Sequence, residues 1–183
     1  MDLLWTDFLN SIWRDWRGTG RPAEDRLNQL EWQIAFLKKW DLMAEAPIKN
    51  NELQVLMKYR THLQCITEKL AAGRQMDQDD TDFLNAFLKE TPVIRQLEFD
   101  QNSWRLEWVS TQSGWKKVLE LIVSSFIQTL MDGHADRIKI CDNKDCLWVY
   151  YDSTKNHSKR YCDDKACGNL LKVRKFRERQ KNK

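Results

Sequence analysis

The chain has 183 residues, of which 42% are hydrophobic, and its formal net charge is +3 at pH 7. A chain of this length can bury about 70% of its unfolded surface, so it can form a hydrophobic core without disulfide bonds. It contains no run of eighteen apolar residues, which excludes a transmembrane helix. The acidic, tryptophan-rich start MDLLWTDFLNSIWRDW is unlike a secretory signal, so we expect a cytoplasmic protein.

Most of the chain before residue 134 has the periodicity of amphipathic helices. Apolar residues recur there at three- and four-residue steps, and glycine follows several of the stretches. The predicted helices carry apolar stripes at Trp5–Trp16, Leu27–Leu37, Leu53–Leu70, Phe83–Leu88 and Trp115–Leu130. Cys65 lies within the third of these stripes, and we expect it to be a half-buried thiol.

The period changes to two between the fourth and fifth helices. Leu97 and Phe99 precede a turn at 100–103, and Trp104, Leu106 and Trp108 follow it, which predicts a β-hairpin. Because most of the nine tryptophans occupy apolar stripes or alternate hairpin positions, we expect them to be buried in the core. Four of them gather near the first helix junction and leave room for a small-molecule effector: Trp13, Trp16, Trp32 and Trp40.

Four of the five cysteines form two pairs with the same spacing, Cys141 with Cys146 and Cys162 with Cys167. Zinc is bound by four thiolate or imidazole ligands in a tetrahedron, and two short-range pairs supply such a set. Between the pairs, an aromatic strand at 147–151, a polar turn at 152–158 and a return at 159–161 predict a second hairpin. A helix follows the last cysteine, and this order of elements resembles a treble-clef zinc site.

Disulfide, iron–sulfur and redox roles suit the cysteines less well than zinc binding. Disulfide bonds require an oxidising compartment, the spacing differs from that of ferredoxin clusters, and no CxxC redox motif is present. A zinc with four thiolates has no open position for a catalytic water, so we expect one structural zinc per chain. His157 lies in the predicted turn, where a solvated or phosphate-facing role suits it better than a ligand role.

These residues resemble the CGNR-type zinc finger, which is named for its final cysteine and the three residues after it. The matching positions are Cys141, Cys146, the aromatic strand into Asp152, Ser153–Asn156, Lys159–Arg160, Tyr161, Cys162 and Cys167–Gly168–Asn169. The preceding region resembles the ABATE domain in its WRGTG and EDRL segments and in the hairpin and helix before the first cysteine. The resemblance implies a stress-induced transcriptional regulator. One departure is Leu170, which stands where the family signature has arginine.

The positive charge is concentrated at the C-terminal end. Residues 137–183 contain 14 lysines and arginines against 6 acidic residues, whereas the rest of the chain contains 16 against 21. A thin apolar stripe at Val173 and Phe176, with Leu170 near it, is expected to dock the last helix on the hairpin of the finger, with cations exposed on both sides. Clusters of this kind are typical of nucleic-acid binding. The candidate contact residues are Lys155, Lys159, Arg160, Lys172, Arg174, Lys175, Arg177 and Arg179.

The sequence therefore predicts a mainly α protein with a small β-hairpin. It consists of a multihelical domain at 1–136, suited to sensing or dimerisation, and a treble-clef-like zinc finger at 137–183. Two functions stay open. A DNA-binding regulator would read bases with Asn169, Arg174 or Lys175, whereas an RNA- or protein-binding adaptor would use the zinc site only as a scaffold. For RNA, the candidate stacking residues are Trp148, Tyr150 and Tyr161. No catalytic motif is present, so we do not expect an enzyme. The sequence does not indicate the oligomeric state.

Overall fold

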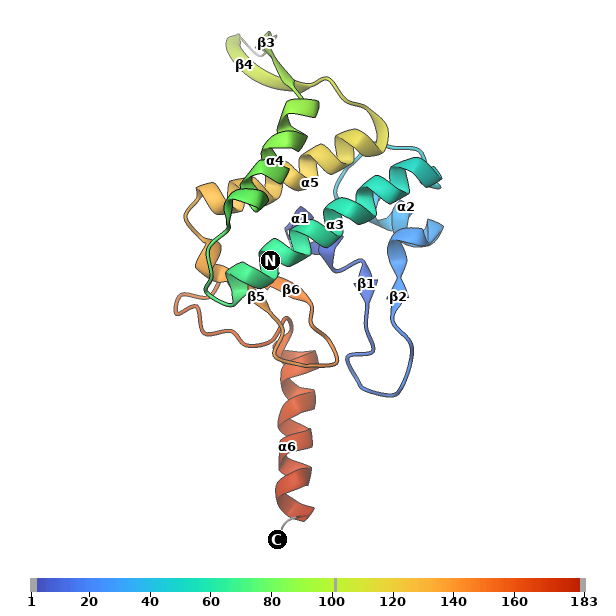
Figure 1. Ribbon diagram of the computed structural model, residues 1–183, viewed down its shortest axis with the longest axis vertical. Helices are drawn as coiled ribbons and strands as arrows, with labels where there is room; N and C mark the ends of the chain where they lie inside the picture. The colour runs from blue at the N-terminus through green and yellow to red at the C-terminus, as the bar shows by residue number, and fades with distance from the viewer. Residues whose placement is uncertain (1–2, 101, 182–183) are drawn as a thin grey trace.

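Helices build most of the molecule, which a computed structural model describes for residues 3–100 and 102–181 (Figure 1). The helices before the finger are α1 (Leu4–Leu9), α2 (Leu30–Lys39), α3 (Asn50–Ala71), α4 (Gln78–Glu90) and α5 (Gly114–Met131). The mainly α fold class predicted from the sequence is confirmed. No helix in the described ranges is long and apolar enough to cross a membrane.

The core lies where α1, α3 and α5 pack together. Trp5 is fully buried, and its ring meets the edge of Phe126 at 5.2 Å between ring centroids. The Trp5 Nε1–H donates to the Thr129 hydroxyl at 3.0 Å, so this large aromatic is buried without an unsatisfied donor. Apolar residues of the long helices fill the space around it: Leu56, Leu63, Ile66, Val118, Leu119, Ile122 and Val123.

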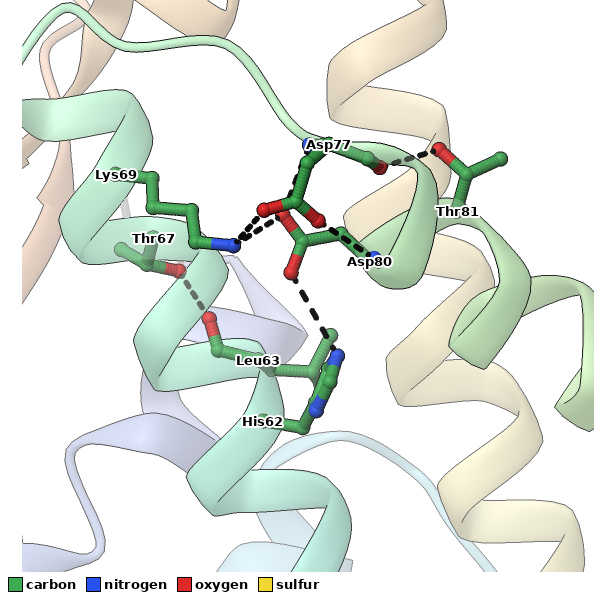
Figure 2. Close-up of polar contacts among 7 residues, drawn as sticks. All are labelled: His62, Leu63, Thr67, Lys69, Asp77, Asp80 and Thr81. Atoms are coloured by element: carbon green, nitrogen blue, oxygen red, sulfur yellow. Dashed lines mark hydrogen bonds and ion pairs between the residues drawn. The ribbon is translucent and has the colours of Figure 1, made fainter.

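A polar cluster joins the end of α3 to the start of α4 (Figure 2). Asp77 caps α4 by accepting the Asp80 N–H at 3.0 Å, and the Asp80 carboxylate accepts the Asp77 N–H at 3.2 Å. Lys69 from α3 donates to both carboxylates, at 2.7 and 2.8 Å. Because Asp80 is only 3% exposed, the ammonium group of Lys69 compensates for the cost of burying its charge.

Cys65, one turn before Lys69, is exposed, so the expectation of a half-buried thiol is wrong.

The first helix is shorter than its apolar stripe predicts. It ends at Leu9, and Ile12–Trp13 instead forms strand β1, which pairs with β2 (Glu24–Asp25). A 3-10 turn at Arg26–Asn28 leads from β2 into α2 and contains the start of the predicted second stripe.

Arg60 of α3 explains why the chain leaves the helix after Leu9. Its guanidinium donates to the Ser11 hydroxyl at 2.7 Å and to the Asp25 carboxylate at 2.6 Å. Arg60 is 6% exposed, so losing Asp25 would leave a buried charge without compensation, and losing Ser11 would remove one of its hydrogen bonds. These tertiary contacts hold β1 against β2 and override the helical periodicity of the segment.

The predicted hairpin is present as β3 (Val93–Asp100) and β4 (Ser103–Ser110), with Leu97 opposite Leu106. It projects from the helices at one end of the molecule (Figure 1). Its tryptophans, which we expected in the core, are 66% and 67% exposed. The alternation correctly predicted one apolar face, but no element of the described chain covers that face.

The four tryptophans near the first helix junction do not form a common pocket. Trp16 packs beside the cysteine cluster, and Trp32 stacks on Phe36 at 4.8 Å between centroids. Trp40 donates its indole N–H to Asp7 at 2.8 Å. The guanidinium groups of Arg21 and Arg26 lie over the Trp13 ring at 5.3 and 5.8 Å. Since each ring has its own neighbours, the four rings do not enclose a site in the described chain, and the small-molecule effector stays a prediction.

The finger begins with a 3-10 turn (Ala135–Arg137) and strand β5 (Ile138–Ile140), and it continues through β6 (Val149–Tyr151), a π-helical turn (Asp164–Gly168) and α6 (Asn169–Lys181). Strand β6 pairs with β5, not with residues 159–161, so the expected hairpin between the two cysteine pairs is wrong. The hairpin instead encloses the first pair. Residues 182 and 183 of the predicted finger lie outside the described residues.

The finger rests directly on the helical core. Ile138 and Val149 are 0% and 1% exposed and belong to the same buried cluster as Trp5. Asn10, just after α1, binds both backbone groups of Val149, at 2.8 and 2.9 Å. Packing and backbone bonding together fix the position of β6 relative to α1.

Candidate functional site

The four paired cysteines converge at one point. Their Sγ atoms all lie within 4.8 Å of one another, and Cys141, Cys146 and Cys167 are at most 3% exposed. Zinc with Zn–S bonds of about 2.3 Å at its centre has tetrahedral S–S edges of about 3.8 Å. The Sγ of Cys162 lies 3.7 Å from that of Cys146 and 3.9 Å from that of Cys167. The donor set and its spacing fit a structural zinc ion.

The turn between β5 and β6 positions the first pair. The Cys141 N–H donates to the Trp148 carbonyl at 2.9 Å, and the Cys146 N–H donates to the Asn143 carbonyl at 2.8 Å. Asn143 is 1% exposed, and its side-chain amide donates to the Trp16 carbonyl at 2.8 Å and to the Cys167 sulfur at 3.4 Å. Asn143 thus connects both cysteine pairs to the loop after β1. Sequence reasoning missed this residue; its place inside the CxxxxC knuckle was the only signal.

A π-helical turn positions the second pair. Asp163 accepts the Ala166 N–H at 2.8 Å and so caps this turn, in which Cys167 is held. A Cβ atom at Gly168 would lie 3.2 Å from the Tyr161 ring, closer than such contacts usually are. A side chain at the residue after the last cysteine would require the Tyr161 ring to shift by a few tenths of an ångström, which favours the glycine of the CGNR motif.

A buried aspartate closes the loop between the pairs. Asp152 is 0% exposed and accepts the Thr154 N–H at 2.9 Å, the Thr154 hydroxyl at 2.6 Å and the Lys159 N–H at 2.9 Å. Burial alone would raise the pKa of Asp152, but these hydrogen bonds lower it. Arg137 donates to the carbonyls of Asp152 and Thr154, which ties the loop to β5. His157 in this loop bonds to Asp136 at 2.8 Å and is no part of the sulfur cluster.

The thiols depend on one another for their charge. Hydrogen bonds from Cys146 and then Cys162 lower the pKa of Cys141 to about 2. The hydrogen bond to Cys141 raises the pKa of Cys146 to about 12 and also raises the pKa of Cys162, while burial raises the pKa of Cys167. Four adjacent thiolates thus require a cation among them, and zinc supplies that charge while displacing the protons.

An arginine fastens α6 to the metal centre. Arg174 donates to the Asp145 carboxylate at 2.8 Å and to the Arg17 carbonyl at 2.6 Å. Gly18, in the left-handed region at φ 62°, allows this approach, because a Cβ there would lie 2.7 Å from the Arg174 guanidinium. The loop after β1, the first knuckle and α6 are thereby held together.

The predicted docking of α6 through Val173 and Phe176 is wrong. Val173 is 46% exposed and Phe176 is 61% exposed, and no residue of α6 is buried. Arg174 makes the contact that the stripe was expected to make. A polar anchor beside the metal replaces apolar packing, and helical periodicity cannot reveal such an anchor. Leu170, in the first turn of α6, is half-buried.

The eight predicted nucleic-acid contacts fall into two groups. Three have partners in the finger: Arg174 as described, Arg160 with Asp142 at 2.7 Å, and Lys159 with the Cys162 carbonyl at 3.0 Å. The remaining predicted contacts are exposed, namely Lys155, Lys172, Lys175, Arg177 and Arg179. Lys181 at the end of α6 is exposed as well.

Of the candidate stacking residues, Tyr150 is 8% exposed and bonds to the Lys159 carbonyl, whereas Trp148 and Tyr161 are half-buried.

Comparison with family models agrees with this architecture. Residues 137–180 match the CGNR zinc finger, and residues 2–133 match ABATE, whose description is "Putative stress-induced transcription regulator". Comparison with curated proteins gives no match. The finger match includes all four zinc ligands, and the ABATE match covers the helical body and its hairpin. The chain therefore belongs to the ABATE family and carries a CGNR zinc finger after the ABATE domain.

Proposed function

We propose that this protein is a transcriptional regulator that binds duplex DNA through α6, with the zinc site holding that helix in place. The observation that carries the proposal is the charge of α6. The helix extends from the body at the end opposite the β3–β4 hairpin (Figure 1). Most of its lysines and arginines are exposed, and it has a single acidic residue, Glu178. Favourable contact with the negative C-terminal dipole accounts for one or two such cations, not for a whole helix of them.

The anchor determines which side of α6 faces outward. At 3.6 residues per turn, Lys172, Lys175 and Arg179 lie about 100–160° around the helix from Arg174. Because Arg174 faces the knuckle, these three cations face away from it. Phe176 lies next to Lys172 on this outward side and is exposed, and a phenyl ring of this kind can contact the methyl group of thymine in the major groove.

The dimensions and the charge suit a duplex. A single α-helix fits the major groove of B-DNA, and lysines along its flanks reach phosphates on either side. Helix α6 has free flanks because none of its residues is buried in the part of the chain that the structure describes. On this proposal Arg174 positions the helix, and the outward cations contact DNA. A cytoplasmic location fits this proposal, because cysteines that bind zinc as thiolates stay reduced in that compartment.

The alternative function, an adaptor, has weak support as an RNA-binding protein. RNA recognition uses exposed rings on which bases stack, and Tyr150 is buried under the loop that Lys159 closes. In the DNA-binding regulator that we propose, the helical domain would be the sensing part.

The test is binding of the zinc-loaded protein to a fluorescent duplex of mixed sequence, about 25 base pairs long, with single-stranded RNA as the competitor. Lys172→Ala, Lys175→Ala and Arg179→Ala combined should weaken duplex binding by at least about 50-fold, because three phosphate contacts are lost. A matched triple variant in the helical domain, Lys38→Ala, Arg74→Ala and Lys89→Ala, removes the same charge from exposed sites and should bind within about twofold of the parent. Equal loss in both variants would show that only net charge matters. Preferential competition by RNA would favour the adaptor.

A further inference from the structure

The face of the β3–β4 hairpin away from its polar side is a continuous apolar surface. The register places Leu97 opposite Leu106 and Phe99 opposite Trp104, and Trp108 follows one pair toward the base, opposite Arg95. These five apolar side chains are 57–67% exposed. The opposite face carries Gln96 with Glu107 and Glu98 with Arg105, so the hairpin is amphipathic. We call the five apolar residues together with Arg95 the hairpin face.

Ser110 bonds to Glu120 of α5 at the base of the hairpin, but no element of the described residues covers its apolar face, which is unusual. Two strands alone are at best marginally stable in water, and both outer edges of this pair are also free along eight residues in the described chain. Contiguous apolar patches of several hundred Å² on a surface mark interaction sites. The structure thus presents a formed strand pair whose covering layer has to come from outside the described residues.

We propose that the hairpin face is a dimerisation surface and that its occupant is the hairpin face of a second copy of this chain. From the exposed fractions, the five side chains offer roughly 650 Å² per copy. Two copies would bury roughly 1,300 Å², which reaches the size of specific protein interfaces. This inference does not depend on DNA binding.

The order of residues along the face makes it complementary to itself. The Leu97–Leu106 pair lies midway, with the aromatic pair Phe99–Trp104 toward the tip and Arg95–Trp108 toward the base. A two-fold axis through the leucine pair places the tip of one copy over the base of the other. Arg95, which lies over Trp108 at 5.9 Å, then meets the rings at the partner's tip, a favourable cation–π arrangement. If the two hairpins instead lay with tip over tip and base over base, the Arg95 side chains of the two copies would meet, and their like charges would repel.

The antiparallel arrangement has a geometric consequence. Because the hairpin and α6 lie at opposite ends of the molecule (Figure 1), the dimer carries its two α6 helices at its two far ends. It would therefore not place them one helical turn apart, the usual spacing of dimeric readers.

Sedimentation and light scattering of the zinc-loaded full chain test the proposal. The parent should have twice the chain mass at about 100 µM, a concentration well above the dissociation constants, roughly µM or lower, of specific interfaces of standard size. Leu97→Lys should weaken dimerisation at least about 100-fold, because two ammonium groups would face each other near the axis. Gln96→Lys adds the same charge to the neighbouring position on the polar face and should stay dimeric.

Hydrogen exchange on the parent gives a second readout that needs no variant. Amides of residues 93–110 should be protected at high protein concentration and should exchange faster on dilution, while those of α3 should not change. A parent that is monomeric at about 100 µM overturns the proposal. Binding of a monomeric parent to anionic vesicles through the hairpin would show that a membrane surface, not a second copy, covers the hairpin face. A dimer that survives Leu97→Lys with its fold intact, or one without concentration-dependent protection of the hairpin, overturns it as well.

Discussion

Single residues determine how the metal centre and α6 are joined. Asn143 links the first cysteine pair to Cys167, and Arg174 links α6 to the knuckle through Asp145. Neither belongs to the zinc ligand set, and neither is apolar, so patterns of ligand spacing and hydrophobicity do not reveal them. Their effect is to make the orientation of α6 depend on the folded zinc site.

Replacing Arg174 separates positioning from direct contact. Arg174→Ala should lower the free energy of unfolding by at most about 1 kcal/mol, because the ion pair with Asp145 is more than one third exposed on both sides. It should weaken duplex binding severalfold and leave the salt dependence unchanged, since no phosphate contact is lost. Lys175→Ala should instead reduce the slope of log K against log[salt] by about 0.9. A reduced slope for Arg174→Ala, measured by titration at several salt concentrations, would show that Arg174 touches DNA itself.

Replacing one ligand tests the metal. Cys162→Ser should reduce bound zinc from one ion per chain to less than about 0.1, because three thiolates of this cluster hold zinc far more weakly than four. The helices before residue 134 should keep their far-ultraviolet dichroism. Cys65→Ser, which changes an exposed thiol on α3, should keep one zinc. Elemental analysis of both variants after gel filtration measures the bound zinc per chain. Zinc retained in Cys162→Ser would refute the four-cysteine site.

At the scale of elements, the junction of α3 and α4 contains a histidine whose pKa burial lowers (Figure 2). His62 stacks on Phe83 at 3.6 Å between centroids, and its Nε2 has no hydrogen-bond partner among the described residues. Burial lowers the pKa of His62, and the carboxylate of Asp80 opposes that shift only in part. The native state thus binds this proton less readily than the unfolded chain does, so stability decreases as pH falls below about 6.5.

Thermal unfolding on either side of the ordinary histidine pKa, at about pH 7.5 and about pH 5.5, measures this effect. His62→Phe keeps a flat ring over Phe83 but cannot be protonated, so it should lose less stability between the two pH values than the parent does. His134→Phe, which removes an exposed imidazole, should behave like the parent. Equal pH dependence in all three proteins would exclude His62 as the source.

Most elements could be predicted from the sequence, and the exceptions share a cause. Helices α3 and α5 form where their apolar stripes predict them, because helical periodicity places the apolar side chains on one face and that face is buried in the core. The segment after Leu9 departs from its stripe because Arg60 and Asp25, distant in sequence, hold it as a strand. The four ligands were evident from spacing alone. Strand β6 was identified, but its partner β5 was not, since pairing between short strands depends on the turn that the metal organises.

At the scale of the whole molecule, charge and hydrophobicity lie at opposite ends. The cationic α6 extends from one end and the apolar hairpin from the other, with the helical core and the buried β5–β6 pair between them (Figure 1). The alternating sequence at 97–108 correctly predicted the strands and their apolar face but not their exposure. A sequence records amphipathicity, whereas what covers the apolar face depends on the tertiary and quaternary arrangement.

The central claim is that exposed cations of α6 neutralise DNA phosphates, and the salt dependence of duplex binding tests it most directly. If about four phosphates are neutralised, the slope of log K against log[salt] should be about −3.6, which is a roughly 150-fold loss of affinity between about 50 and 200 mM salt. The triple replacement of Lys172, Lys175 and Arg179 by alanine should flatten that slope by about 2.7. A parent slope near zero, or a triple variant with the parent's slope and affinity, would contradict the account.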